Sequence, residues 1–507
     1  MARQSGRRKN VLIVMADEQS WDTLGAHGNP VARTPHLDAL AARGASFRHS
    51  YTPYPLCCPA RASLWTGLLP HTHHVMGNWR RIRPDLEDAG LMHAFGEAGY
   101  HTLYTGKWHV PGTTPSRLGF AATAAIPAVV KGRDKGRYIE PYRAYVQGLG
   151  YRLAHSEVEN LTERDMAQLH RPGKAPCGTA EIQLEHYLET WQTGQFLDTL
   201  AARPADQPFF AVCSFNAPHF PMIVPEPFDR LIDPDDVPLP PSLRSGPTTK
   251  PAEVARSKFA QHAADLDEGE WRRLIAHYWG MCALVDSQVG RIVAYLETEG
   301  LLDDTVIVFT ADHGDMMGAH GLLEKGYPLH YEQDLRVPLI IVDPESPDGV
   351  RPEGIVTLLD VLPTVAELTG VTLPGNHEGM SAAVALKDAG TPLRPHALAE
   401  TFTYNGAEGG DGEYVSLDDF EALDGTANLS IRTPEARYVF RWNDVDELYD
   451  LSADPHEIHN RAADASHQQQ TQRLREALLE EVERTAPHFG QLVRARMALG
   501  NDRPGSI

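Results

Sequence analysis

Short runs of apolar residues, rich in β-branched side chains, recur along the chain as far as Val342. Each run is shorter than a typical helix and is bounded by polar or turn-forming residues. Such runs are typical of strands that a sheet buries on both faces. They predict strands at Val11–Ala16, Thr102–Thr105, Phe209–Phe215, Thr305–Ala311 and Val337–Val342.

Segments with apolar residues at helical spacing lie between these runs. One covers His36–Gly44, directly after a Thr34-Pro35 pair that suits a helix cap and first turn. Others cover Tyr187–Leu200 and Trp271–Glu299. Strands that alternate with helices favour a mostly parallel central sheet flanked by helices on both faces. The predicted fold class is therefore α/β.

The sequence pattern changes in the last quarter of the chain, where acidic and glycine-rich turns separate shorter predicted strands and helices. Two strand-like runs and an amphipathic helix are expected there, at Asn428–Arg432, Arg437–Arg441 and Gln468–Thr485. We predict a large α/β domain over residues 9–375 and a smaller α+β domain over residues 376–507. The irregular stretches 112–178 and 225–251 are expected to be surface excursions that set specificity.

The composition narrows the classes of partner. The chain has 507 residues, and its 46 basic and 68 acidic residues give a net charge of −22. A negative field repels phosphate backbones, so we expect no nucleic acid partner, and an anionic substrate would need a locally positive site. The run Val11–Ala16 is too short for a membrane span or a signal-peptide core. Five cysteines, with Cys57 and Cys58 adjacent, do not suggest a disulfide framework, so we expect a cytoplasmic protein without a membrane partner.

Titratable residues follow four of the predicted strands directly. Any one of these segments alone is typical of a turn or a helix cap. In an open α/β sheet, however, ligands bind outside the carboxyl ends of the strands, so the four segments are expected to meet at one edge. They are Asp17-Glu18, Gly106-Lys107-Trp108-His109, Asn216-Ala217-Pro218-His219 and Asp312-His313-Gly314-Asp315. Their convergence predicts a site.

The first and last of these segments supply candidate metal ligands. Asp17, Glu18 and Asp312 offer hard carboxylate oxygens, which favour calcium, magnesium or manganese. His313 adds an imidazole nitrogen, which keeps manganese or zinc open. Because these residues lie far apart in the sequence, the site would exist only in the folded chain.

The stretch from Cys57 to Gly67 is the candidate reactive segment. Pro59 suits the first position of a helix and Gly67 suits its end, so Cys57 is expected just before the helix N-terminus. Unpaired amide N–H groups and the helix dipole favour an anion at that place. Arg61, one turn inside, could offer a fork of donors to sulfate or phosphate.

The pattern Cys57-x-Pro59-x-Arg61, followed by Thr66-Gly67, resembles the signature of type I sulfatases, formylglycine-dependent members of the alkaline phosphatase superfamily. In that family the cysteine is oxidised after translation to formylglycine. The resemblance extends in order over roughly residues 9–460. It includes Val11–Asp17, Lys107–His109, Ala217-Pro218-His219, Asp312–Asp315, Lys325, Glu447–Leu451 and Asp454-Pro455. It implies an alkaline-phosphatase-like fold and a sulfuric ester hydrolase.

The chain departs from the family pattern at a few positions. Ala60 replaces the usual serine after the proline, and Glu18 stands where the family often has a second aspartate, so it would be a direct or an outer ligand. His313 stands where the family frequently has asparagine. This histidine variant is similar to the choline-sulfatase, iduronate-sulfatase and phosphonate monoester hydrolase branches. Asn78 also resembles a substrate contact of the phosphonate hydrolases. Those enzymes lack the Lys107-Trp-His109 element, which favours sulfate monoesters here.

The resemblance implies a role for each site residue. One divalent cation, calcium before manganese, magnesium or zinc, would be held by Asp17, Glu18, Cys57, Asp312 and His313. The implied catalytic residues are Cys57, Arg61, Lys107, His109, His219 and Lys325, and the implied substrate contacts are Asn78, Lys107, His219 and Lys325. The hydrated aldehyde at position 57 would attack sulfur, with Asp312 accepting its proton. His219, helped by Lys325, would protonate the leaving alcohol, and His109 would release sulfate by deprotonating the remaining hydroxyl.

Several alternatives follow from the same residues. We rank a sulfatase of arylsulfatase type first and a phosphonate monoester or phosphodiester hydrolase second. A hydrolase using the unmodified Cys57 thiol comes third, and a non-catalytic binding protein fourth. The first interpretation requires a formylglycine-generating enzyme as a partner, and related bacterial enzymes suggest a homodimer or homotetramer. Three histidines outside the predicted site residues, His71, His73 and His74, are expected to line the substrate pocket or lie at the surface. Asp286 is expected to be structural. Asp315 is expected to form a turn or to contact a metal ligand without binding the metal itself.

Overall fold

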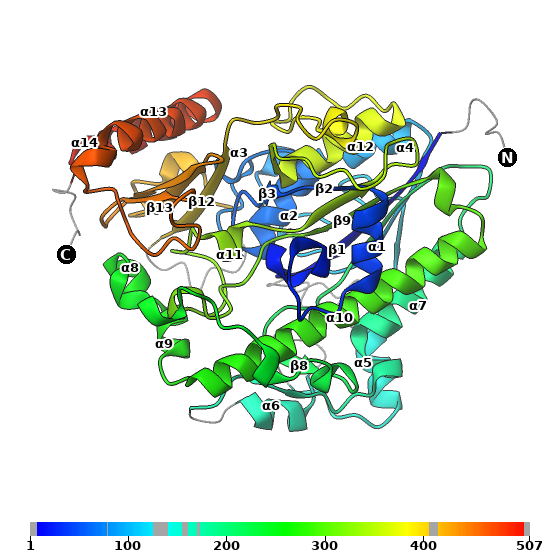
Figure 1. Cartoon of the computed structure of the whole chain (residues 1–507). Helices are drawn as coiled ribbons and strands as arrows, with labels where there is room; N and C mark the ends of the chain where they lie inside the picture. The colour runs from blue at the N-terminus through cyan, green and yellow to red at the C-terminus, as the bar shows by residue number, and fades with distance from the viewer. Residues whose placement is uncertain are drawn as a thin grey trace.

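A central sheet organises the larger part of the molecule. The computed structural model describes residues 8–78, 80–124, 140–154, 161–169, 173–404 and 414–500. Within these residues the sheet has seven strands in the order β2-β10-β9-β1-β7-β4-β5 (Figure 1). The strands are β1 Asn10–Ala16, β2 Ala45–Ser46, β4 His101–Gly106, β5 Ala122–Ala124, β7 Phe209–Ser214, β9 Thr305–Ala311 and β10 Leu339–Val342. β9, β1, β7, β4 and β5 pair in parallel, and β10 alone runs in the opposite direction, antiparallel to both β9 and β2. The prediction of a mostly parallel α/β sheet is confirmed.

Helices cover both faces of this sheet, as the fully apolar strands require. Successive side chains of a strand point to opposite faces. Leu12 and Val14 accordingly belong to one core, beneath α1, α7 and α10, whereas Ile13 and Met15 belong to the other, beneath α2, α4 and α12 (Figure 1). The first layer has α1 Pro35–Arg43, α7 Leu188–Ala201 and α10 Glu268–Thr298, and the second has α2 Cys57–Thr66, α4 Met92–Glu97 and α12 Val361–Thr369.

One predicted excursion contains more regular structure than expected. The described parts of 112–178 include β5 at the sheet edge, as well as α5 Glu140–Gly148, α6 Glu163–Leu169 and β6 Cys177–Thr179. Tyr142 and Val146 of α5 pack against Tyr187 and Leu188, so this segment has its own small core. Residues 125–139, 155–160 and 170–172 of the predicted excursion lie outside the described residues. The stretch 225–251 is irregular, as predicted, with short 3₁₀ turns only.

The C-terminal part forms a second, antiparallel sheet in the order β12-β13-β14-β15. Its elements are β12 Ala397–Thr403, β13 Thr426–Arg432, β14 Ala436–Arg441, β15 Glu447–Asp450, α13 Gln468–Thr485 and α14 Pro487–Ala498. The two helices lie at one end of the molecule beside β12 and β13 (Figure 1), and Leu478 and Phe489 contribute to the same core as Leu429. A smaller C-terminal α+β unit is therefore confirmed, while the boundary between residues 375 and 376 stays a prediction.

The remaining helices and strands are short. They are α3 Pro70–His73, α8 Ala252–Ala255, α9 Lys258–Ala263, α11 Glu332–Leu335, β3 His49–Tyr51, β8 Met222–Val224 and β11 Ile355–Thr357. β3 pairs with β11, and β6 pairs with β8. Among the described helices, none has both the length and the hydropathy that crossing a bilayer requires.

Candidate active site

The register of the central sheet brings the two predicted acidic segments together. β1 and β9 are parallel neighbours, and Ala16 is paired with Ala311. The residues that follow, Asp17 and Asp312, therefore leave the sheet side by side. Cys57 enters the same space as the first residue of α2. Ligand atoms of Asp17, Cys57, Asp312 and His313 all lie within 4.8 Å of one another, and the four residues are buried.

This cluster fits a divalent cation. Oδ1 of Asp17 is buried and accepts no hydrogen bond from any described residue. Nδ1 of His313 lies 2.8 Å from the Gly314 carbonyl, which can only accept, so this nitrogen carries the proton. Nε2 then presents a lone pair, 3.2 Å from Sγ of Cys57 and 3.8 Å from Oδ1 of Asp17. Two carboxylates and an imidazole fixed in the ligating tautomer form a donor set that calcium, manganese, magnesium or zinc can use.

Arg61 lies one turn into α2 and is fully buried. Its Nε donates to Oδ2 of Asp312 at 2.7 Å, and Nη1 donates to the Lys107 carbonyl at 2.7 Å and to Oγ of Ser214 at 2.8 Å. Nη2 lies 3.8 Å from Oδ1 of Asp17 and donates no hydrogen bond to a described group. Two of the three guanidinium nitrogens, expected to face an anion, are thus bound to Asp312, Lys107 and Ser214 instead.

Lys107 follows β4 and reaches the cluster from a third strand. Its ammonium forms an ion pair with Oδ2 of Asp17 and lies 3.7 Å from Sγ of Cys57. Burial by itself raises the pKa of Asp17, but the Lys107 ammonium and the other nearby cations outweigh it and lower this pKa well below the ordinary value. Asp17 is therefore ionised. His109, two residues after Lys107, is buried and has a left-handed backbone with φ of 53°.

A second group of site residues lies beside the cluster. His219 ends the turn after β7, and its Nε2 lies 3.3 Å from Nζ of Lys325. Lys325 also forms an ion pair with Glu18, whose carboxylate does not belong to the four-residue cluster. Burial lowers the pKa of His219 well below its ordinary value, and the Lys325 ammonium lowers it further. The His219 ring is therefore neutral beside a charged lysine.

Asn78 contacts the helix that carries Cys57. Its Oδ1 accepts a hydrogen bond from the backbone N–H of Cys58 at 3.0 Å. The side chain thereby satisfies one of the unpaired N–H groups at the start of α2. Its predicted contact with substrate stays a prediction.

Comparison with known proteins identifies the family. The model of the family described as Sulfatase matches residues 9–371, which is more than two thirds of the chain. A second model, described as N-sulphoglucosamine sulphohydrolase, C-terminal, matches residues 318–484.

The chain belongs to the sulfatase family.

Individual relatives agree with this assignment. The sulfatase is 27% identical to an arylsulfatase of Clostridium perfringens, over 94% of this chain and 95% of the relative. It is 30% identical to a choline-sulfatase of Rhizobium meliloti, over 90% of this chain and 82% of the relative. Its fold is similar to the crystal structure of a phosphonate monoester hydrolase of Agrobacterium radiobacter, with a TM-score of 0.78, 27% identity and coverage of 94% and 96%. The sulfatase is accordingly a sulfuric ester hydrolase of the alkaline phosphatase superfamily.

The cysteine thiol itself is a poor nucleophile in this sulfatase. Burial, together with the neighbouring Asp17, raises the pKa of Cys57 to about 12, against the effect of Lys107. A thiolate would therefore be scarce near neutral pH. This disfavours the alternative in which the unmodified thiol attacks the substrate.

Two expectations about histidines were wrong. His71 and His73 are buried rather than at the surface, and they do not belong to the four-residue cluster. His71 contacts Glu400 on β12, and Nε2 of His73 lies 2.9 Å from Oγ of Ser63 on α2. His74 is half-buried and stacks on Tyr414. These side chains serve packing between the two sheets.

The structural roles expected for two aspartates agree with the contacts. Asp286 accepts hydrogen bonds from the backbone N–H groups of His36 and Leu37 at the start of α1. Asp315 accepts them from the N–H groups of Met317 and Glu324, which fixes the loop after β9. Neither carboxylate belongs to the four-residue cluster.

Sequence reasoning missed residues that position the site. Ser214 binds Arg61, and as the last residue of β7 it could have been found by the same rule that selected Asp17 and Asp312. Tyr278 donates to the Glu18 carbonyl at 2.8 Å from the middle of α10. Tyr278 lies among the apolar residues of a predicted helix, so nothing in the sequence indicated that it contacts the site.

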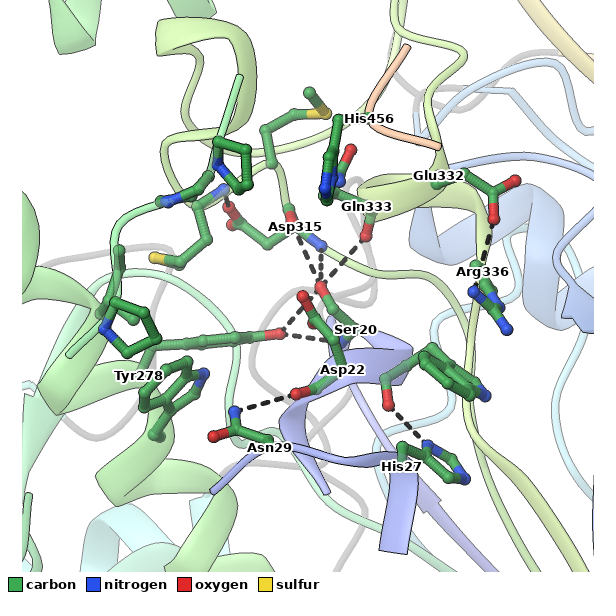
Figure 2. Close-up of a pocket in the computed structure, with 18 of the residues that line it drawn as sticks. Ser20, Asp22, His27, Asn29, Tyr278, Asp315, Glu332, Gln333, Arg336 and His456 are labelled. Atoms are coloured by element: carbon green, nitrogen blue, oxygen red, sulfur yellow. Dashed lines mark hydrogen bonds and ion pairs between the residues drawn. The ribbon is translucent and has the colours of Figure 1, made fainter. Parts of the chain in front are cut away.

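A separate cavity of about 470 Å³ lies next to these supports. Figure 2 shows Ser20 among the lining residues, hydrogen-bonded to Asp315, Gln333 and Tyr278. Trp21, Trp279 and the prolines of residues 238–241 also line it, but none of the predicted metal, catalytic or substrate residues does.

Proposed function

We propose that this sulfatase hydrolyses sulfate monoesters, aryl sulfates among them, with residue 57 as formylglycine and one divalent cation at the four-residue cluster. The observation that carries this proposal is the position of Cys57. It begins a buried helix, and its Sγ lies within 4.8 Å of ligand atoms of two carboxylates and an imidazole. A thiol whose pKa is raised in this way would be a poor nucleophile there. Formylglycine supplies a hydrated aldehyde, whose hydroxyl is a nucleophile and whose second hydroxyl permits release of sulfate by C–O cleavage.

The cation would be held by Asp17, Asp312, His313 and residue 57. It would supply Lewis-acid stabilisation of negative charge on the sulfate oxygens. We propose calcium first, because the carboxylates are hard oxygen ligands, with manganese, magnesium or zinc as the other candidates.

The protein's own cations give the site its local positive charge. Arg61, Lys107 and Lys325 converge on the sheet edge although the chain as a whole carries −22. We propose that Lys107 and Lys325 bind the sulfuryl oxygens of the ester, together with Asn78. Arg61 holds Asp312 in the orientation in which its carboxylate accepts the proton of the attacking hydroxyl.

The leaving group would face His219 and Lys325. Nδ1 of His219 lies 2.5 Å from the Phe220 carbonyl and must donate, so Nε2 is the acceptor of the Lys325 ammonium. The pair thus holds a proton, carried by the Lys325 ammonium, next to where the leaving oxygen would stand. His109 would accept the proton of the second hydroxyl when sulfate is released.

Two esters with one leaving group test the substrate class. We expect kcat/KM for 4-nitrophenyl sulfate to exceed that for 4-nitrophenyl phenylphosphonate by about tenfold or more. The second candidate is a phosphonate monoester or phosphodiester hydrolase. It is favoured by the TM-score of 0.78 to such an enzyme and by Asn78 beside Cys58. A preference for the phosphonate ester would replace the first proposal with the second.

Removal of the metal tests the cation. Dialysis against a chelator is expected to lower kcat by about 100-fold or more, and calcium is expected to restore it. Restoration by manganese, magnesium or zinc but not by calcium would contradict the proposed metal.

Three further proposals concern the maturation, the oligomeric state and the cellular location of the enzyme. Maturation requires a formylglycine-generating enzyme that meets the chain before it folds, because Cys57 is buried in the folded protein. A homodimer or homotetramer stays a prediction that light scattering on the purified protein tests. A cytoplasmic location also stays a prediction.

A further inference from the structure

The turn after β1 sends two neighbouring carboxylates in different directions. The Asp17 carboxylate is part of the four-residue cluster. Glu18 has a left-handed backbone with φ of 70°, which is uncommon for a residue with a side chain. Its N–H donates to Oδ1 of Asp312 at 3.0 Å, and its carbonyl accepts from the Tyr278 hydroxyl at 2.8 Å. These two bonds hold the Glu18 backbone in this conformation.

Residues around the cavity of Figure 2 brace this turn. The Ser20 N–H donates to the Tyr278 hydroxyl at 2.8 Å. Its Oγ accepts from the Asp315 N–H at 3.0 Å and donates to the Gln333 carbonyl at 3.0 Å (Figure 2). The turn is therefore tied to α10 and to the loop after β9. A change of the Glu18 backbone that redirected its Cα–Cβ bond would have to break these contacts.

The Glu18 carboxylate contacts the residues proposed to act on the leaving group. Oε2 forms an ion pair with Lys325, accepts from the Phe220 N–H at 3.4 Å and lies 3.6 Å from Nε2 of His219. Lys325 and His219 come from segments that are remote in sequence. One carboxylate oxygen thus touches the lysine, the histidine and the backbone that follows the histidine.

We propose that Glu18 is a positioning residue for the Lys325–His219 pair rather than a ligand of the cation. The inference rests on the proposed function, in which this pair protonates the leaving group. When the S–O bond to the leaving group breaks, its electron pair remains on the leaving oxygen. A proton of the Lys325–His219 pair is transferred to that oxygen, and the pair regains a proton from water before the next turnover.

The dependence of rate on the leaving group tests this role. 4-Nitrophenolate is a stable anion and leaves without a proton, whereas phenolate benefits from protonation. In Glu18→Gln we expect kcat/KM for phenyl sulfate to fall at least about tenfold more than for 4-nitrophenyl sulfate. We also expect the variant, analysed by elemental mass spectrometry, to keep the metal content of the wild type.

Asp17→Asn is the matched control for a ligand. Its metal content is expected to fall, and its activity is expected to fall alike for both esters. If Glu18→Gln behaved in this way, Glu18 would be a ligand and the proposal would be overturned. An unchanged ratio of the two esters with full metal content would also overturn it, because positioning of the proton donor would then have no effect.

A double-mutant cycle keeps the test decisive if Glu18→Gln folds poorly. A residue that acts only through Lys325 has no further effect once Lys325 is removed. We therefore expect Glu18→Asp combined with Lys325→Met to match Lys325→Met alone in the ratio of the two esters. Independent, multiplying effects on that ratio would overturn the proposal.

Failure of the proposed function would be visible separately. The wild-type enzyme would then prefer aryl phenylphosphonates to aryl sulfates. The same comparison of phenyl and 4-nitrophenyl leaving groups, made with those esters, would decide the role of Glu18 in the same way.

Discussion

At the scale of single residues, the site depends on side chains whose charge the fold controls. Glu189 on α7, which contacts the segment after β7 that carries His219, is an example. It is buried, and its Oε1 accepts from the Ala217 N–H at 3.0 Å, two residues before His219. Burial raises its pKa from the ordinary 4.5 to about 7. The fold thus holds the proton of Glu189 more tightly than the unfolded chain does.

This shift predicts how stability depends on pH. Because the folded-state pKa lies above the unfolded value, the contribution of Glu189 to the free energy of unfolding falls as pH rises from about 4.5 to about 7. Glu189→Gln keeps the acceptor oxygen and abolishes the titration. Above pH 7 we expect the variant to be more stable than the wild type, by up to about 3 kcal/mol. Urea unfolding at pH 5 and pH 8 measures the difference, and an equal difference at both values would contradict titration of the buried Glu189 carboxyl as its cause.

The ligand residues could be predicted from the sequence because they depend only on strand order. Asp17 and Asp312 follow parallel neighbours, and the register of β1 and β9 places them together. The direction of Glu18 could not be predicted in this way. It depends on the sign of one backbone angle, which contacts with Asp312 and Tyr278 determine, and those residues lie 294 and 260 positions away.

At the scale of elements, α2 places residue 57. Its sequence predicted the helix and its glycine end, but the helix begins at Cys57, two residues before Pro59. Pro59 is tolerated because the first N–H groups of a helix have no intrahelical partner. Gly67 ends the helix with φ of 70°, and its N–H donates to the Ser63 carbonyl at 2.8 Å. The side chains that surround Gly67 could not be predicted, because the nearest ones, His377 and Leu91, come from other segments of the chain.

Gly67→Ala tests this helix end. A Cβ there would lie 2.8 Å from Cβ of His377 and 2.9 Å from Cδ1 of Leu91. We expect the free energy of unfolding to fall by about 2–4 kcal/mol, from the left-handed backbone and the overlap together. Gly300→Ala is the matched control, because its φ is 65° and a Cβ would meet nothing within 4 Å. It should cost only about 1 kcal/mol, and equal losses in thermal or urea unfolding would contradict the role of the overlap.

At the scale of the whole molecule, buried ion pairs join the C-terminal sheet to α11, the short helix that precedes β10. Glu332 on α11 pairs with Arg432 on β13 at 3.0 Å and with Arg437 on β14. Nε of Arg437 also pairs with Glu457 at 2.6 Å, and Arg437 is almost fully buried. The sequence predicted both units but not this contact, because no local pattern shows which charges of two remote segments will be buried together.

Arg437→Met tests the importance of this junction. Removal of one partner leaves the Glu457 carboxylate buried without its cation, which is expected to cost about 3–5 kcal/mol. Arg494→Met is the control, because Arg494 on α14 pairs with Glu483 on α13 at the exposed surface. Thermal unfolding should show a clear loss for the first variant and no change for the second. Equal midpoints for the two variants would contradict a stabilising role of the buried pairs.

The most direct test of the whole account is the mass of the peptide that contains residue 57, measured on the purified, active enzyme. Oxidation of the cysteine to formylglycine makes this peptide about 18 Da lighter, and the modified form is predicted to react with a hydrazine probe. The modified fraction should rise and fall with specific activity across preparations. A fully active enzyme whose peptide carries an unmodified thiol, alkylated by iodoacetamide after unfolding, would contradict the account.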